Sequence, residues 1–154
     1  MPSAQFWRGT AKAIAAVEFA VASPVLFLLL AFMVDYGFLN HANTALNAAV
    51  SAGAQYAYLT GITVTASNVQ TLVKNTSGLT GVTAVVTGPA CYCVTGTTPS
   101  LTLSAAGCNV TCPDGVTKSG YYVVINATYN YSAFMPNLVS IANHVSASQT
   151  VQLQ

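Results

Sequence analysis

Residues 13–34 read AIAAVEFAVASPVLFLLLAFMV, and a single charged residue, Glu18, interrupts this otherwise apolar run. A helix of about 20 apolar residues crosses the hydrocarbon core of a bilayer, so the run is long enough to span a membrane. Pro24 removes one backbone hydrogen bond and predicts a kinked or loosened helix at that point. An unpaired carboxylate is costly inside a bilayer and usually has a function. We therefore expect the Glu18 carboxylate to pair with a positively charged group, and a free amine is the simplest candidate.

The residues flanking the run predict how the chain is oriented. Arg8 and Lys12 precede it, whereas Asp35 follows it with no basic residue nearby. The positive-inside rule then predicts a cytoplasmic N-terminus and export of the rest of the chain. A cleaved signal peptide, cut late near Gly37 or Ala42, is the alternative, although a carboxylate early in the apolar run fits it poorly.

Composition narrows the classes of function. The chain has 154 residues, of which 53% are apolar and 5% charged, whereas soluble domains carry about 25% charge. This favours an anchored or assembled protein. The net charge is +1 and no basic patch exists, which argues against nucleic acid. Two isolated histidines, His41 and His144, form no nucleophile–base pattern, and no phosphate-binding loop is present. We therefore expect no catalysis, cofactor or metal.

The apolar helix is predicted to continue beyond the membrane. No proline lies between Tyr36 and Tyr58, and Thr60-Gly61 provides a plausible end. Apolar residues recur at three- and four-residue steps, which defines one face. Small residues on this segment would let another helix approach closely, and they are Ala42, Ala45, Ala49, Ala52 and Gly53. The same stripe would suit packing on the chain's own head, and we expect both contacts.

After Gly61 the pattern predicts a small antiparallel sheet packed against the extended helix, an α+β fold. Thr65–Asn75 is predicted to be a helix with Thr65 or Ser67 as its cap. Pro136–Asn143 is predicted to form a short turn or helix. Three strands are predicted, the last two from their alternation of side-chain character: Val82–Thr87, Tyr121–Tyr131 and Val145–Leu153.

The four cysteines are predicted to lie in an irregular segment between the strands. Cys91 and Cys93 are too close in sequence to bond to each other without strain. Two pairings remain: Cys91–Cys108 with Cys93–Cys112, or Cys91–Cys112 with Cys93–Cys108. A four-thiolate zinc site is the alternative, but the spacings differ from those of zinc ribbons. Export favours disulfides.

The segment Lys12–Ala20 (KAIAAVEFA) resembles the processing region of TadE/TadF-like minor pseudopilins of the tight-adherence (Flp-type) pilus machinery. Further segments resemble the same family: Val34–Gly37, Gly53–Ala57, Tyr121–Tyr131, Phe134–Pro136 and Val145–Ser148. The resemblance implies a pilin-like architecture with four parts. They are a leader over 1–13, a transmembrane helix over 14–35, a helix extension over 36–60 and an exported disulfide-containing head over 61–154.

In that family a prepilin peptidase leaves glutamate at the fifth mature position, which implies a cut between Ala13 and Ile14. Ala13 departs from the family's usual glycine. The new amine at Ile14 would pair with the Glu18 carboxylate of a neighbouring subunit, next to Phe19 of that subunit. This pair would set the axial register between the two subunits. The implied partners are other pilins or pseudopilins, the peptidase, the inner-membrane assembly platform and the lipid bilayer.

The resemblance implies a single-pass protein of the inner membrane, with its head periplasmic or extracellular, or a component of the pilus. The alternative function is an exported adhesive or ligand-binding domain carried on the same anchor.

Overall fold

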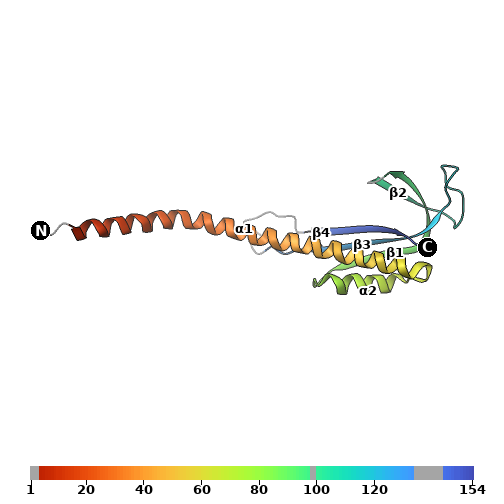
Figure 1. The fold of residues 1–154 in the computed structure, drawn as a ribbon, viewed down its shortest axis with the longest axis horizontal. Helices are drawn as coiled ribbons and strands as arrows, with labels where there is room; N and C mark the ends of the chain where they lie inside the picture. Colours follow the sequence, from red (N-terminus) through yellow and green to blue (C-terminus); the bar gives the residue numbers. More distant parts are fainter. Residues whose placement is uncertain (1–3, 98–99, 134–143) are drawn as a thin grey trace. The chain divides into compact units, whose positions relative to one another are not determined.

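The computed structural model describes residues 4–97, 100–133 and 144–154, with side chains from residue 16 onward except those of Thr97 and Ser100. Figure 1 shows the elements in sequence order. They are helix α1 (Ala4–Thr60), the short 3-10 helix η1 (Gly61–Thr63), helix α2 (Ala66–Ser77) and strands β1 (Thr83–Thr97), β2 (Ser100–Ala105), β3 (Gly120–Asn130) and β4 (His144–Gln152). The chain divides into two compact units, Met1–Phe38 with Ser132–Ile141, and Leu39–Tyr131 with Ala142–Gln154. The predicted turn or helix at Pro136–Asn143 lies outside the described residues.

In the first unit, α1 continues through Pro24 without a break. Proline lacks the N–H that would bond the carbonyl of Ala20, four residues earlier. The Ser23 hydroxyl donates to that carbonyl instead, over a long 3.4 Å. A side-chain donor thus partly replaces the lost backbone bond, which is how membrane helices tolerate proline.

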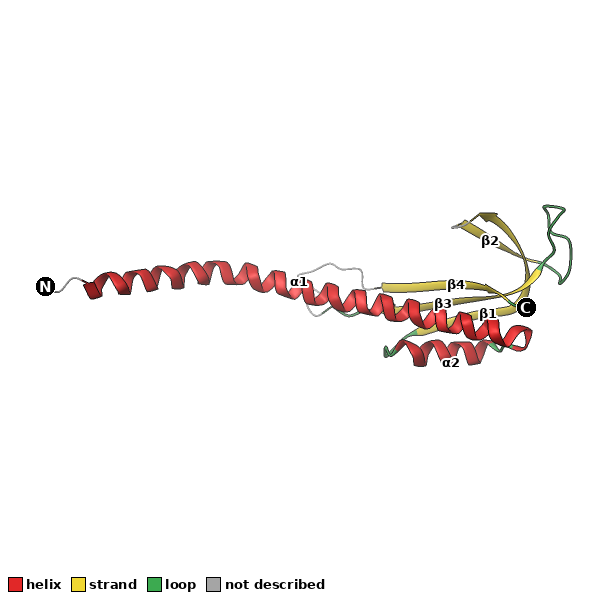
Figure 2. Ribbon diagram, viewed as in Figure 1, coloured by secondary structure: helices red, strands yellow, loops and turns green. Residues whose placement is uncertain are grey.

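In the second unit, α1 and α2 lie on one side of a four-stranded sheet (Figure 2). The helix buries Leu46, Val50, Ala54 and Ala57 at three- and four-residue steps, as its sequence pattern predicts. These side chains join one hydrophobic core with Val69 and Val73 of α2. The sheet contributes Val82, Ala84, Val86, Val123, Ile125, Ala127, Val145, Ala147 and Leu153.

The sheet has the order β2-β1-β3-β4, and every neighbouring pair is antiparallel. The predicted α+β class is confirmed. So is the alternation of β3, where Val123, Ile125 and Ala127 are buried, while Asn126 on the other face is exposed. Helix α2 starts one residue after Thr65, which occupies the N-cap without a side-chain hydrogen bond, so its hydroxyl does not act as predicted.

The predicted strand over Val82–Thr87 was too short. Strand β1 runs on to Thr97, because a bulge absorbs Gly88 and Pro89 between the partners Thr87↔Val124 and Ala90↔Tyr122. Gly88 has φ +110, and a Cβ there would meet the Tyr122 carbonyl oxygen at 2.5 Å, so the bulge requires glycine. Strand β2 was missed altogether. It forms a hairpin with the second half of β1 that curves away from α1 (Figure 2).

At Gly53, α1 lies close to the rest of the head. A Cβ built there lies 2.7 Å from Cγ2 of Val73 and 3.6 Å from Cδ1 of Ile125, so α1 touches both α2 and β3 at this point. The closeness of backbone and side chain explains why the helix interior carries glycine despite a propensity penalty of about 1 kcal/mol relative to alanine.

The change Gly53→Ala is therefore expected to lower the free energy of unfolding of the head by about 1–3 kcal/mol through overpacking, despite the gain in helix propensity. Denaturant unfolding followed by near-ultraviolet circular dichroism would measure it. Gly37→Ala in the same helix, where no atom lies within 4 Å of the added Cβ, is the matched control and should not destabilise. Equal stability of the two variants would contradict the close approach.

Candidate assembly interface

The predicted cut falls inside a helix. Ala13 and Ile14 are both part of α1, and Glu18 lies four residues after Ile14, so the two positions share one helix face. The side chain of Glu18 is exposed, as is that of Phe19 at 66%. The carboxylate is therefore open to a partner from another molecule.

Around Glu18, α1 presents an uncovered apolar surface. The helix over Ala16–Thr63 contains a window long and apolar enough to cross a membrane, and none of that window is buried by the chain itself. Apolar side chains more than 45% exposed lie all round it, at Val17, Phe19, Val21, Val25, Leu26, Phe27, Leu28, Leu29, Leu30, Phe32, Met33 and Val34. A helix that is apolar on every side and uncovered is suited to lipid or to other helices.

Aromatic residues mark the end of this apolar surface. The rings of Phe32 and Tyr36 are stacked with centroids 6.3 Å apart, and Tyr36 and Phe38 are exposed. Tyrosine, with its apolar ring and polar hydroxyl, favours the interface between lipid and water. Asp35, next to Tyr36, is fully buried and has an interaction partner. From the sequence, Asp35 was only a residue that flanks the membrane, because no local pattern shows that a single carboxylate is buried.

The small residues in the helix extension, residues 36–60 of α1, differ in how far they are buried. Ala42, Ala49 and Gly53 are buried, and Ala45 and Ala52 are partly buried. Ala49 belongs to the chain's own core, so part of the stripe serves the head. The exposed face carries mainly neutral polar residues, which are Asn40, His41, Asn43, Thr44, Asn47, Ser51 and Gln55.

The cysteines form two disulfides, Cys91–Cys108 and Cys93–Cys112, with Cα–Cα distances of 5.1 and 5.6 Å. This selects one of the two pairings left open by the sequence. The predicted irregular location was wrong for the first two cysteines, since both lie in β1. Alternation places Cys91 and Cys93 on one face of the hairpin, and the bonds fasten the loop after β2 to that face.

The loop is also ordered by Asp114. Its Oδ1 accepts hydrogen bonds from the backbone amides of Val116 and Thr117, both 3.0 Å, and its Oδ2 accepts one from the Thr117 hydroxyl at 2.5 Å. These bonds, led by that of the Thr117 hydroxyl, lower the pKa of the Asp114 carboxyl below its ordinary value of 3.8. The Asp114-Gly115 pair thus serves as a turn.

The two histidines lie on different elements, His41 in α1 and His144 at the start of β4. His41 is exposed, and His144 Nδ1 lies 3.0 Å from Asn130 Oδ1. In the described part of the chain, no three His, Cys, Asp or Glu side chains are placed to hold a metal ion.

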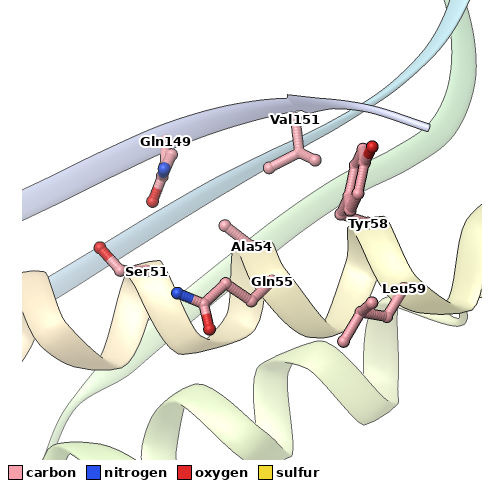
Figure 3. A pocket seen from close by; sticks show the side chains of 7 residues that line it. All are labelled: Ser51, Ala54, Gln55, Tyr58, Leu59, Gln149 and Val151. Carbon is pink, nitrogen blue, oxygen red and sulfur yellow. The ribbon is translucent and has the colours of Figure 1, made fainter.

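A groove of about 530 Å³ separates the last turns of α1 from β4. Figure 3 shows Gln149 and Val151 of β4 facing Ala54 and Tyr58 of α1, with polar side chains among the apolar ones. No lining residue is charged; the remaining three are Ser51, Gln55 and Leu59.

Residues 13–55 match the family of TadE-like proteins. The resemblance found from the sequence is confirmed for this segment, which begins at the predicted cut and includes Glu18 and the stripe of small residues. No match was found among curated proteins or among solved structures.

The TadE-like segment and the uncovered apolar part of α1 coincide. A helix of this length and composition is suited to anchoring the chain in a membrane.

Proposed function

We propose that this protein is a non-catalytic pseudopilin that acts in assembly or initiation of a tight-adherence pilus by packing its N-terminal helix against other pilins. The carrying observation is the TadE-like match over an exposed apolar helix segment that contains the carboxylate of Glu18. The N-terminus is cytoplasmic, residues 14–35 span the inner membrane, and the head is exported. Prepilin peptidase and the inner-membrane assembly platform are the proposed partners besides pilins.

The proposed register mechanism uses two charges. Cleavage between Ala13 and Ile14 creates an amine at Ile14, and the exposed Glu18 of a neighbouring subunit pairs with it. In a low-dielectric helix bundle a charge is tolerable when paired and costly when alone. Pairing therefore favours one axial offset between neighbouring helices over all others.

The exposed helix face would add lateral contacts. Ala45 and Ala52 are partly buried and small, so a second helix could approach beside them. Asn43 and Asn47 form a local ladder on the exposed side, where Asn47 Nδ2 donates to both the carbonyl and the side-chain oxygen of Asn43 at 2.9 Å. Amide groups of this kind can hydrogen-bond across a helix pair.

Intact mass and N-terminal sequencing of the protein from its native membrane, without reductant, test the proposal. We expect a chain that starts at Ile14 and is lighter than its reduced form by two hydrogens for each of the two disulfides. A chain starting at Met1 would leave a signal-anchored protein without pilin processing. A chain starting beyond residue 35 would refute the anchor.

A further inference from the structure

The outer edges of the sheet are unprotected. Strands β2 and β4 lie at its two ends, and in the described part of the chain no further strand pairs with either. Neither strand contains a charged residue or a proline. Natural sheets usually blunt exposed edges with such residues because free edges pair with other chains. Two edge strands without such residues on one small sheet therefore indicate that a strand of another chain pairs with them.

The backbone groups that β4 leaves free can be assigned. The Leu153 amide donates to the Tyr121 carbonyl at 2.9 Å, so these two residues form a hydrogen-bonded pair. The register of β3 and β4 has no bulge. Because hydrogen-bonded and non-hydrogen-bonded pairs alternate, outward N–H and C=O groups belong to Ser146, Ser148, Thr150 and Gln152.

The same reasoning applies to β2. The Ala106 amide donates to the Cys91 carbonyl at 3.0 Å, which leaves outward groups on Leu101, Leu103 and Ala105. The side chain of Leu101 is 48% exposed, and Leu103 is partly buried but outside the hydrophobic core. This edge thus offers free hydrogen-bonding groups beside apolar side chains that the chain's own core does not cover.

The directions of β2 and β4 allow antiparallel pairing between two copies that share one orientation. Each neighbouring pair in the order β2-β1-β3-β4 is antiparallel, so β4 runs opposite to β2. Moving one copy sideways without rotating it then places its β2 antiparallel beside β4 of the next copy. Antiparallel pairing of two β4 strands would instead require one copy to be inverted. Copies anchored in one membrane share an orientation. We propose that β2 of one copy pairs with β4 of a neighbouring copy, extending the sheet from head to head.

The groove beside β4 fits this occupant. Directly paired residues share a sheet face, so with Leu103 opposite Ser148 the incoming Thr102 and Ser104 would lie on the side of α1. There the groove of about 530 Å³ presents the amide side chains of Gln149 and Gln55. The hydroxyls of Thr102 and Ser104 would contact the neutral amides of these two glutamines, and the pairing would bury no charge.

Crosslinking of the full chain in lipid vesicles tests the inference. A benzophenone amino acid at Ser148 should give a covalent dimer, and mass spectrometry should locate the link within Ser100–Ala105 of the other copy. The same probe at Val85, which is 53% exposed on central strand β1, is the matched control and should not reach β2 of a second copy. Links only to β4, to lipid or to a different protein would overturn the inference.

Edge-blocking variants give a second measurement. Thr150→Pro removes one outward N–H without breaking the pairing with β3, and it should reduce dimer yield about tenfold. Thr150→Val keeps that N–H and should dimerise normally. Leu103→Pro blocks the opposite edge and should cause the same loss, while thermal unfolding verifies that each variant is folded. Unchanged yield in both folded proline variants would refute strand pairing.

The inference depends on the proposed function only for the shared orientation of anchored copies. The two can fail separately. An uncleaved chain that still forms the β2–β4 link would refute pilin processing alone. A chain that starts at Ile14 but forms no such link would refute strand pairing alone.

Discussion

Replacing Glu18 with alanine is expected to leave expression and membrane insertion intact and to abolish pilus assembly. Removing one partner of a buried ion pair costs about 3–5 kcal/mol because the other charge stays buried and unpaired. Here the unpaired group would be the amine of Ile14 in the neighbouring subunit. The loss corresponds to at least about a hundredfold weaker subunit contact. Sheared pili, quantified against the membrane-bound pool, would measure it.

Three further variants separate charge from shape. Glu18→Gln keeps the size of the side chain but not its charge, and it should fail like alanine. Glu18→Asp keeps the charge on a shorter side chain and should retain partial assembly. Val21→Ala, at another exposed position of the same helix, should assemble normally. Normal pili from Glu18→Ala would refute the register mechanism.

Removing both disulfides is expected to unfold the β1–β2 hairpin and the following loop while the core of the head stays folded. The bonds close segments with sequence separations of 17 and 19 residues, and a loop of about that size contributes about 3 kcal/mol. No residue between Val86 and Val123 belongs to the described hydrophobic core. The hairpin therefore depends on the crosslinks and not on core packing.

Hydrogen exchange measured by mass spectrometry would detect this directly. With all four cysteines changed to alanine, the hairpin amides should exchange about a hundredfold faster, while those of Val123–Ala127 change little. Cys91→Ala with Cys108→Ala is the milder comparison, because Cys108 is exposed whereas Cys93 and Cys112 are both buried. Equal acceleration across the core would show instead that the disulfides support the whole head.

Several elements could be predicted because their signals are local. The run at residues 13–34 needs only its length and composition to predict a helix that can span a membrane. Strands β3 and β4 alternate side-chain character with little interruption, and each buries one face. The resemblance to TadE-like proteins was drawn from segments within residues 12–57 and from three segments between Tyr121 and Ser148. The family match covers residues 13–55 and therefore only the first of these regions.

Other features depended on contacts distant in sequence. Gly88-Pro89 has the local signature of a strand end, yet pairing with β3 carries β1 through it as a bulge. Strand β2 does alternate polar and apolar residues over Ser100–Ala105, but this signal is only six residues long and lies between cysteines, in a segment that was predicted to be irregular. The disulfide pairing could not be chosen from spacing, since both arrangements close loops of similar size.

The sequence by itself determined the long apolar helix, the position of its one carboxylate and the alternating strands, because each is set by periodicity or composition within a single segment. Only the tertiary structure decided that Gly53 serves contact with α2 and β3, that β1 and β2 form a disulfide-bonded hairpin, and that β2 and β4 are free edges. These features are relations between segments far apart in the chain, and no local pattern encodes which surfaces meet.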